Sequence, residues 1–547
     1  MVERNGPKIG VQGSVLGWND PFHPDLCRTV MRTGEGRVLG PQDPQPTVET
    51  FMELLRSLGA DLYLHHVMPD AAEADRFLDA VERFDIDFLL GNEYGNINGP
   101  YGDALNRYDV PDSCVAKAAR SARFQGLLYD ETEHLQLHPS MYLDYHPEEA
   151  TRGRRRHQWA NVDGLTLQES EDAVTDAVEA RREAYGGNVE MYGEHVFPTM
   201  FHALARGGMN PCPKVLKEEF ASAQLATALG AARQYGRKLG VCVDFWGQDV
   251  GTWFTRIWGF PGHSPAEYRS ALELAYLYAP DLLFTENVDV LARNTPRGFE
   301  RTEFGDILHD FTHRFVPAHP LAHHHSQCDP DVVLIRSDDT DWGGEEHPYG
   351  NSALTFDYRS RTPFKAFHML SRGSLPANGI LTFLPQYTYH SGFYPRTDET
   401  MGVLPLERGV DPRRATDTHR LFHPLPNVLV LDERADAEAI GNPGLILLVG
   451  SRMTPRCLSA VAEKVRGGAT CIAMRWLVPP ARDLSWKDGA GRWIVVDDLE
   501  CAVVQEAVRP FLGEPGVWRR RFGDVEVRLY NESGDGITVG HEVGGRR

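Results

Sequence analysis

Two acidic residues stand at the C-terminal ends of apolar runs, a placement that suits paired carboxylate chemistry. Glu131 follows the run at residues 126–129, and Glu286 follows the run at residues 281–285. Hydrolysis of a glycosidic bond uses two carboxyl groups, because one is protonated and assists the leaving oxygen while the other is ionised. A separation of about 5–5.5 Å gives retention of configuration, and one of about 6.5–9.5 Å gives inversion. Glu131 and Glu286 are therefore the predicted catalytic pair.

The other predicted strand ends are polar or aromatic in the same way. Most of them carry a carboxylate, imidazole or indole group, which favours one shared polar cleft. Sugars present apolar faces as well as hydroxyl groups, so rings beside carboxylates suit a carbohydrate. The predicted substrate-binding residues are Trp18, His65, Asn92, Glu93, Tyr129, Asp130, Glu194, His195, Asp244, Trp246, Asp338 and Trp342.

The acid role has two rivals on the sequence alone. Glu133 lies on the same side as Glu131 under the period-two alternation of a strand, so position does not separate them. Glu93 follows Asn92 at the end of the third predicted strand, and it becomes the rival acid if the strand count shifts. Both alternatives stay open at this point.

Eight short apolar runs predict the strands that position these groups. Buried parallel strands are apolar on both faces, as these runs are. Stretches with helical spacing lie between them, for example at residues 47–58. The alternation predicts a (β/α)8 barrel, with a doubly wound open sheet as the alternative, and active sites in such barrels lie at the C-terminal strand ends. The runs are residues 9–15, 62–67, 88–91, 126–129, 190–196, 240–245, 281–285 and 332–336.

A different order of elements begins near residue 421. Apolar runs at 427–431 and 444–450 are followed by helical spacing at 454–466, two glycines and a third run at 470–474. This order predicts a small doubly wound α/β domain, and it lacks the glycine fingerprint of a dinucleotide site. Alternating residues near the C-terminus predict a β module. The predicted domains are 1–395, a catalytic barrel; 396–495, the small α/β domain; and 496–547, the β module.

The segments around both glutamates resemble those of a known enzyme group. Residues 124–131, FQGLLYDE, and residues 283–286, LFTE, are similar to the strand-four and strand-seven segments of retaining (β/α)8 glycoside hydrolases of the clan A type. The resemblance implies that Glu131 is the acid/base and Glu286 the nucleophile, in a double displacement on an oligo- or polysaccharide. The commonest pattern has Asn before the acid/base, whereas this chain has Asp130, which leaves the sugar type open.

The small α/β domain is similar to the amidotransferase-like trimerisation domain of bacterial β-galactosidases. This resemblance implies a homo-oligomer, with a trimer as one possibility.

Composition excludes several classes of function. The 547 residues carry 56 Lys and Arg against 77 Asp and Glu, a formal net charge of −21. Nucleic-acid binding needs a basic surface, and anionic lipid repels an acidic one. No apolar run is long enough to span a membrane, no secretory signal is visible, and the eight cysteines form no C-x-x-C pair. We therefore expect a cytoplasmic protein of carbohydrate metabolism, with no nucleic-acid or membrane partner.

Three consecutive histidines at residues 323–325 form one metal-binding pattern in the sequence, and His65 with His66 at the end of the second predicted strand forms another. Adjacent histidines in an extended segment point to opposite sides, so we expect no convergence on an ion and predict neither metal nor cofactor. Two alternatives remain beside the glycoside hydrolase: a metal-dependent barrel hydrolase, which EDTA would inactivate, and a non-catalytic carbohydrate-binding protein, which would bind sugars without cleaving aryl glycosides.

Overall fold

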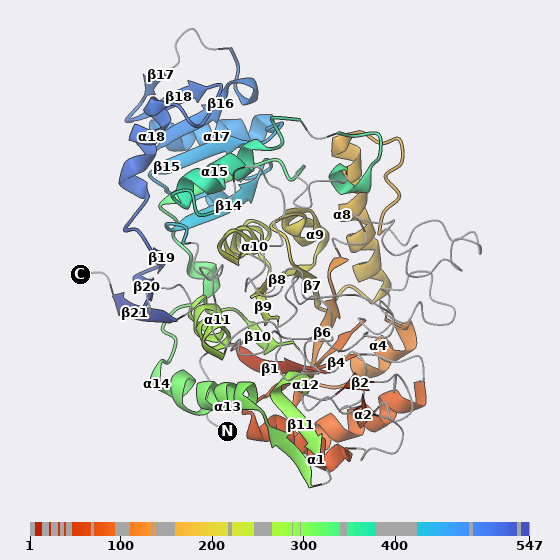
Figure 1. The fold of residues 1–547 in the computed structure, drawn as a ribbon. Coiled ribbons are helices and arrows are strands. Elements are labelled where there is room, and N and C mark those ends of the chain that lie inside the picture. The colour runs from red at the N-terminus through yellow and green to blue at the C-terminus, as the bar shows by residue number, and fades with distance from the viewer. Residues whose placement is uncertain are drawn as a thin grey trace.

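The structure is a computed structural model, and a closed parallel barrel forms its centre (Figure 1). It describes residues 6–13, 21–22, 31–32, 38–39, 46–66, 71–92, 110–132, 136, 159–216, 221–244, 265–286, 288–295, 297–339, 347–355, 357–375, 377, 424–480, 485–532 and 538–545.

The barrel of the described residues has eight strands, in the spatial order β1-β10-β9-β8-β7-β6-β5-β4. Every neighbouring pair is parallel, and β1 closes the ring by pairing with β10 on one side and β4 on the other. The predicted (β/α)8 barrel is therefore confirmed. The strands are β1 Lys8–Gln12, β4 Leu62–His66, β5 Asp87–Gly91, β6 Phe124–Tyr129, β7 Met191–His195, β8 Asn210–Val215, β9 Gly240–Val243 and β10 Leu282–Thr285.

The interior of the barrel is a packed apolar layer. Because strand side chains alternate between two faces, every second residue of each strand points inward. These inward residues form one buried cluster: Leu62, Leu64, Leu89, Leu128, Tyr192, Cys212, Cys242, Leu282 and Phe284. The layer closes the barrel below its C-terminal end, so the next inward position on each strand lies at the mouth.

Two predictions about the strands are wrong. The apolar pattern predicts Val332–Arg336, β13, as the eighth barrel strand. This segment instead pairs with β14, Val428–Asp432, and β15, Leu445–Val449, in a separate sheet. The missing barrel strand is β8, Asn210–Val215, whose sequence NPCPKV lacks a continuous apolar run. Pro211 and Pro213 lie two residues apart, so their missing N–H groups fall on one side of the strand. Glu286 consequently follows the eighth barrel strand, and Asp244 follows the seventh.

Helices surround the barrel, and their sequences account for where they begin. Thr47 and Thr166 each cap a helix by accepting a backbone N–H, with a reciprocal bond from the third residue of the helix. Caps of this kind stabilise a helix by about 1 kcal/mol. These helices are α1 Val48–Ser57, α2 Ala71–Phe84, α4 Asp112–Ala118, α8 Leu167–Ala184, α9 Phe201–Gly207, α10 Ala221–Tyr235, α11 Pro265–Leu277, α12 Val288–Leu291, α13 Glu303–Asp310 and α14 Val316–Ala318.

Several small elements lie around the barrel and after its last strand. The hairpin β11 and β12 lies beside α13, and a π-helical turn, η2, continues that helix. Two short antiparallel strands, β2 and β3, come after β1. The bounds are β2 Met31–Arg32, β3 Val38–Leu39, β11 Ala292–Thr295, β12 Gly298–Arg301, η2 Phe311–Phe315, η3 His325–Gln327 and η4 Pro348–Gly350.

A second, mixed sheet has the order β14-β13-β15-β16-β18-β17, parallel except for β17. The predicted run of two strands, a helix and a further strand is found here as β14, β15, α17 and β16. The barrel sheet ends at Thr285, well before the predicted limit at residue 395, which itself lies outside the described residues. The elements are β13 Val332–Arg336, α15 Thr362–Leu370, β14 Val428–Asp432, α16 Ala437–Ile440, β15 Leu445–Val449, α17 Pro455–Arg466, β16 Thr470–Met474, η7 Arg475–Leu477, β17 Ser485–Asp488, β18 Gly491–Val496, α18 Ala502–Val508 and η8 Arg509–Phe511.

Helix α10 lies between the barrel and the second sheet, where it packs on both β8 and β14 (Figure 1). Its residues 221–232 are all buried, and most of them are small. Gly230 makes the closest approach, because a Cβ there would lie 1.6 Å from the Val430 carbonyl oxygen. The small residues of α10 are therefore explained by its contact with β8 on one face and β14 on the other.

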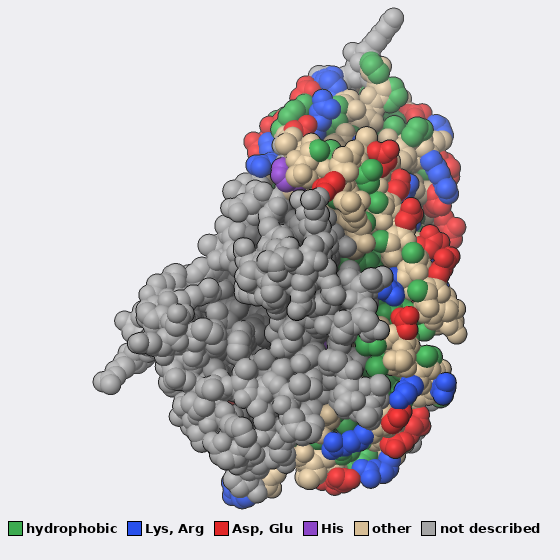
Figure 2. Space-filling view, turned by 90° about the vertical axis from the view of Figure 1, so that its right-hand side faces the viewer, with side chains coloured by type: hydrophobic (Ala, Val, Ile, Leu, Met, Phe, Trp, Pro, Cys, Tyr) green, Lys and Arg blue, Asp and Glu red, His purple; other side chains and the backbone are tan. Residues whose placement is uncertain are grey.

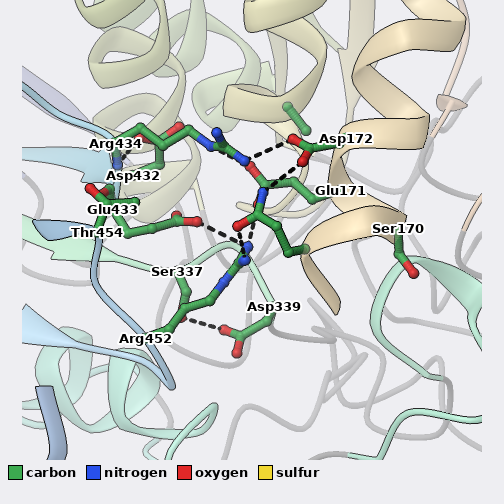
Figure 3. A network of polar contacts seen from close by, with 12 residues as sticks. Ser170, Glu171, Asp172, Ser337, Asp339, Asp432, Glu433, Arg434, Arg452 and Thr454 are labelled. Carbon is green, nitrogen blue, oxygen red and sulfur yellow. Dashed lines mark hydrogen bonds and ion pairs between the residues drawn. The ribbon is translucent and has the colours of Figure 1, made fainter. Parts of the chain in front are cut away.

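A network of charged side chains also joins α8 to the second sheet (Figure 3). Glu171 of α8 is buried and contacts the guanidinium groups of Arg434, at 3.3 Å, and Arg452. Arg434 also pairs with Asp172 at 2.8 Å, and Arg452 with Glu433 at 2.9 Å. Removing one partner of a buried pair costs about 3–5 kcal/mol, because a charge is left uncompensated. These pairs therefore fix the second sheet against the barrel.

The chain ends in a three-stranded antiparallel sheet, as the alternating C-terminal pattern predicts. Its strands are β19 Val517–Phe522, β20 Val525–Asn531 and β21 Val539–Gly545. No helix among the described residues is long and apolar enough to cross a membrane, and no two described cysteines form a disulfide. On the face drawn in Figure 2, acidic and basic side chains are interspersed over the described surface.

Candidate active site

Five carboxylates surround one lysine at the C-terminal end of the barrel. The Lys214 Nζ atom lies 3.0 Å from Asp130 Oδ1, 3.1 Å from Glu131 Oε1 and 2.9 Å from Glu286 Oε2. It also lies 3.2 Å from Asp244 Oδ2 and 3.7 Å from Glu194 Oε2. Both residues of the predicted catalytic pair therefore belong to one charged group, which we call the carboxylate cluster: Asp130, Glu131, Glu194, Lys214, Asp244 and Glu286.

Strand alternation explains why these side chains meet. On five of the eight strands the last inward apolar residue is followed two positions later by a member of the cluster, so Cys212 leads to Lys214 and Phe284 leads to Glu286. Asp130, Glu194 and Asp244 follow Leu128, Tyr192 and Cys242 in the same way. Backbone bonds extend past the strand ends, since the Glu286 N–H donates to the Val243 carbonyl at 3.0 Å. The alternation of side chains along the strands therefore directs the cluster toward the barrel axis.

Glu131 reaches the cluster by a different route. Adjacent strand residues point to opposite faces, yet Asp130 and Glu131 both contact the same Nζ. Glu131 has φ +43°, in the left-handed region that a side chain with a Cβ adopts at a cost. Such strain is concentrated at functional sites. Its side chain is 14% exposed, more than any other carboxylate of the cluster, so Glu131 lies nearest to solvent.

Burial and charge act in opposite directions on the protonation of the cluster. Burial alone would lower the pKa of Lys214, but Asp130, Asp244 and Glu131 raise it well above its ordinary value. Burial, together with Glu286 and Asp130, raises the pKa of Glu194 well above its ordinary value, against the lowering effect of Lys214. Lys214 is therefore a protonated amine at neutral pH, and burial favours the neutral form of Glu194 more than it would be favoured in a free glutamate.

Lys214 is the member that sequence reasoning missed. The segment NPCPKV lacks the apolar run of a buried strand, so it was not included in the predicted barrel. Its last inward residue, Lys214, was therefore not considered for the site. The available signal was the alternation of Cys212 and Lys214, which continues the apolar-then-polar order of the other strand ends. Asp130, Glu194 and Asp244 were predicted from the strand-end pattern, and the structure places all three in the carboxylate cluster.

Several predicted binding residues lie elsewhere. The His65 ring stacks on Phe77 of α2 at 4.0 Å, and the Tyr129 ring packs edge-on against Trp159 at 5.1 Å. His195 packs edge-on against Phe201 at 4.6 Å.

Asn92 supports the cluster through the backbone, because its Oδ1 accepts the Asp130 N–H at 3.1 Å. Asp338 follows β13 and therefore lies in the contact between the second sheet and the segment after β7. There it accepts from Arg336 at 2.8 Å and from the Thr199 hydroxyl at 3.2 Å. Trp18, Glu93, Trp246 and Trp342 lie outside the described residues, as does the rival acid Glu133.

A metal ion does not suit the cluster. Glu194, Cys242 and Glu286 bring ligand-type atoms within 4.8 Å of one another. The Lys214 ammonium, however, lies 2.9 Å from Glu286 and 3.7 Å from Glu194, and it repels a second cation. The residues present therefore fit acid–base and nucleophilic chemistry better than metal coordination.

Comparison with known proteins shows a distant structural likeness. No known family model matches the chain, and no curated protein matches it. The structure is similar to a β-galactosidase from Bacillus circulans sp. alkalophilus, with a TM-score of 0.51 at 9% sequence identity, over 97% of this chain and 93% of that chain. It is also similar to a catalytic mutant of Gan42B, a GH42 β-galactosidase from G. stearothermophilus, with a TM-score of 0.49 at 9% identity, over 96% and 92% of the two chains.

The first of these likenesses confirms the predicted resemblance at the level of fold. It spans 97% of the chain, and so includes both the barrel and the second sheet. An exo-β-1,4-mannosidase from Opitutaceae bacterium strain TAV5 is similar at a TM-score of 0.40 and 11% identity, over 87% of this chain and 77% of that chain. A fold shared at this distance hosts many functions, so activity has to be argued from the site.

Proposed function

We propose that this chain is a glycoside hydrolase that acts with retention at the carboxylate cluster. Glu131 protonates the leaving oxygen and later deprotonates water, while Glu286 forms the glycosyl-enzyme ester. The observation that carries the proposal is the shared contact of both glutamates with the Lys214 Nζ atom. Two oxygens within 3.1 Å of one atom are at most about 6 Å apart, which favours the retaining spacing of about 5–5.5 Å.

The surroundings of the two glutamates suit their different roles. Glu286 is almost fully buried beside the Lys214 ammonium, which stabilises an ionised carboxylate ready to attack. Glu131 is the most exposed carboxylate of the cluster, where a leaving group and then water can reach it. Burial raises the pKa of Glu194, and in its protonated form this carboxyl group can donate a hydrogen bond to a sugar hydroxyl.

Asp244 is the matched rival for the nucleophile. It follows β9, the seventh barrel strand, which is the position that the resemblance gives to the nucleophile. It also contacts Lys214, at 3.2 Å. We favour Glu286 because its side chain is one methylene longer and extends further from its strand end. The two assignments make opposite predictions for rescue by azide.

A panel of aryl glycosides identifies the cleaved sugar, after which three variants separate the roles. We expect Glu286→Ala to reduce kcat by at least 10⁴-fold and azide to restore turnover with the inverted glycosyl azide as product. Glu131→Ala should lose activity most on substrates with poor leaving groups. Glu179→Gln, on the exposed face of α8, is the control and should keep full activity.

Other outcomes reassign the site. Azide rescue of Asp244→Ala with an unrescued Glu286→Ala would give the nucleophile to Asp244. Inactivation of the native chain by EDTA would favour a metal-dependent hydrolase. Binding of oligosaccharide without cleavage of any aryl glycoside would favour a carbohydrate-binding protein. Homo-oligomerisation, including a trimer, stays a prediction that light scattering of the purified chain tests.

A further inference from the structure

A second group of ligand-type side chains lies at the opposite, N-terminal end of the barrel. Asp281 immediately precedes β10, whereas His324 and His325 come from the segment that leads to the second sheet. His325 Nε2 lies 2.8 Å from Asp281 Oδ2, and His324 Nε2 lies 3.5 Å from Asp281 Oδ1. One ligand atom from each residue lies within 4.8 Å of the others. These residues are separate from the carboxylate cluster, which lies beyond the far ends of the strands.

The structure overturns the expectation that adjacent histidines diverge. His323 does turn away, since its Nε2 bonds to the Leu277 carbonyl at 3.0 Å. The 3-10 turn η3 begins at His325, so the backbone leaves the extended conformation there. As a result the His324 and His325 rings lie 4.1 Å apart and face the same carboxylate. Adjacent side chains diverge only in a straight segment, and this segment bends.

We propose that Asp281, His324 and His325 bind a divalent first-row transition metal ion such as Zn²⁺. Two imidazole nitrogens and one carboxylate oxygen are a common donor set for such ions, whereas Mg²⁺ and Ca²⁺ prefer oxygen alone. Ligands about 2.0–2.2 Å from a tetrahedral ion are about 3.4 Å apart. That spacing is close to the 3.5 Å between His324 and Asp281. The ion takes the place of the proton in the His325–Asp281 hydrogen bond.

Neighbouring groups hold the three ligands in place. The Leu239 N–H donates to Asp281 Oδ2 at 2.9 Å, and the His325 N–H donates to the Ala279 carbonyl at 3.1 Å. His324 Nδ1 accepts the Ser326 backbone N–H at 3.3 Å and lies 2.9 Å from the Ser326 hydroxyl, and these contacts orient its ring. Outer contacts of this kind fix ligand orientation in metal sites. The His324 side chain is 46% exposed, so an ion can enter from solvent and keep water in its remaining positions.

A bound ion would tie two parts of the molecule together. It would join the start of β10 to the segment between the barrel and the second sheet. A ligand that binds the native state alone raises stability in proportion to the logarithm of its concentration over Kd. Zinc should therefore raise the unfolding temperature without changing activity, because the site lies at the end of the barrel away from the catalytic pair.

The test is titration of chelator-stripped full-length chain with Zn²⁺, by calorimetry and by thermal unfolding. We expect one Zn²⁺ per chain and a higher Tm. His324→Ala and Asp281→Asn should each weaken binding at least tenfold. His324 is exposed, so its variant should fold, and Asn at 281 can still accept the Leu239 N–H. His313→Ala is the control, because that histidine is exposed and lies outside the group.

Absence of Zn²⁺ binding at micromolar concentration would overturn the proposal. So would binding that survives both ligand variants, or binding that Glu286→Gln abolishes instead. An unchanged kcat in His324→Ala keeps this result independent of the proposed hydrolase activity.

Discussion

The Lys214 ammonium touches every carboxylate of the cluster. It approaches Asp130, Glu131 and Glu286 most closely, at 2.9 to 3.1 Å. An ammonium in that position favours ionised carboxylates and fixes where they point. We therefore regard Lys214 as a positioning residue that prepares Glu286 for attack and holds it near Glu131.

Lys214→Met should reduce kcat by about 100-fold or more, and it should also lower stability, because the buried carboxylates lose their counter-charge. Loss of the ammonium raises the pKa of the neighbouring carboxylates, so the acidic limb of the pH–rate profile should move to higher pH. Lys214→Arg should restore part of the activity. Lys238→Met is the matched control, since Lys238 pairs with Glu190 at 3.0 Å beside the N-terminal end of β9. An unchanged pH profile in Lys214→Met would refute this role.

At the scale of the element, helix α10 shows how packing on two faces constrains sequence. It contacts β8, which carries Lys214, and β14 of the second sheet. Small residues let the helix approach both surfaces, and Gly230 marks the point of closest contact. The position of β8 in the barrel therefore depends on a helix shared by two sheets.

Gly230→Ala should destabilise the chain by about 3 kcal/mol, because the added methyl group overlaps the Val430 carbonyl and the packed core relaxes poorly. Denaturant unfolding measures the change. Gly544→Ala is the control, since nothing lies within 4 Å of its added Cβ. Equal stability of the two variants would show that α10 and β14 have room between them for a methyl group.

At the scale of the whole molecule, the strand patterns anticipated most of the architecture. Seven barrel strands, together with β14, β15 and β16 of the second sheet, were predicted from apolar runs, because burial on both faces leaves a local signature. β8 was missed because Pro211, Pro213 and Lys214 interrupt that signature. β13 was assigned to the wrong sheet because the sheet that a strand joins is decided by pairing partners that are distant in the sequence. The candidate pair Glu131 and Glu286 was singled out from the predicted strand ends, but their common partner Lys214 was not, because its strand was not recognised.

The docking of the C-terminal sheet on α11 should make stability depend on pH. Glu273 of α11 is largely buried near His541, at 3.8 Å, and the Val539 N–H donates to Ser270 at 3.1 Å. Burial raises the pKa of Glu273 to about 7, with Arg269 opposing and Glu532 adding to the shift.

A raised carboxyl pKa means that the native state binds the proton more tightly than the unfolded state. The stabilisation is therefore full below about pH 4.3 and is lost as pH rises to about 7. Between about pH 4.5 and about pH 8 the free energy of unfolding of the native chain should fall by about 3 kcal/mol through Glu273. Glu273→Gln should abolish this fall, as measured by urea unfolding. Glu506→Gln, on the exposed face of α18, should follow the native profile. A Glu273→Gln profile parallel to the native one would contradict the assignment.

The proposed covalent double displacement at the carboxylate cluster is tested most directly by trapping its glycosyl-enzyme intermediate. A 2-deoxy-2-fluoro glycoside of the cleaved sugar should inactivate the enzyme, because the fluorine slows hydrolysis of the glycosyl ester. Peptide mass spectrometry should then place one glycosyl group on Glu286. An adduct on Asp244 would contradict the assignment of the nucleophile, and rapid turnover with inverted product and no adduct would contradict the retaining mechanism itself.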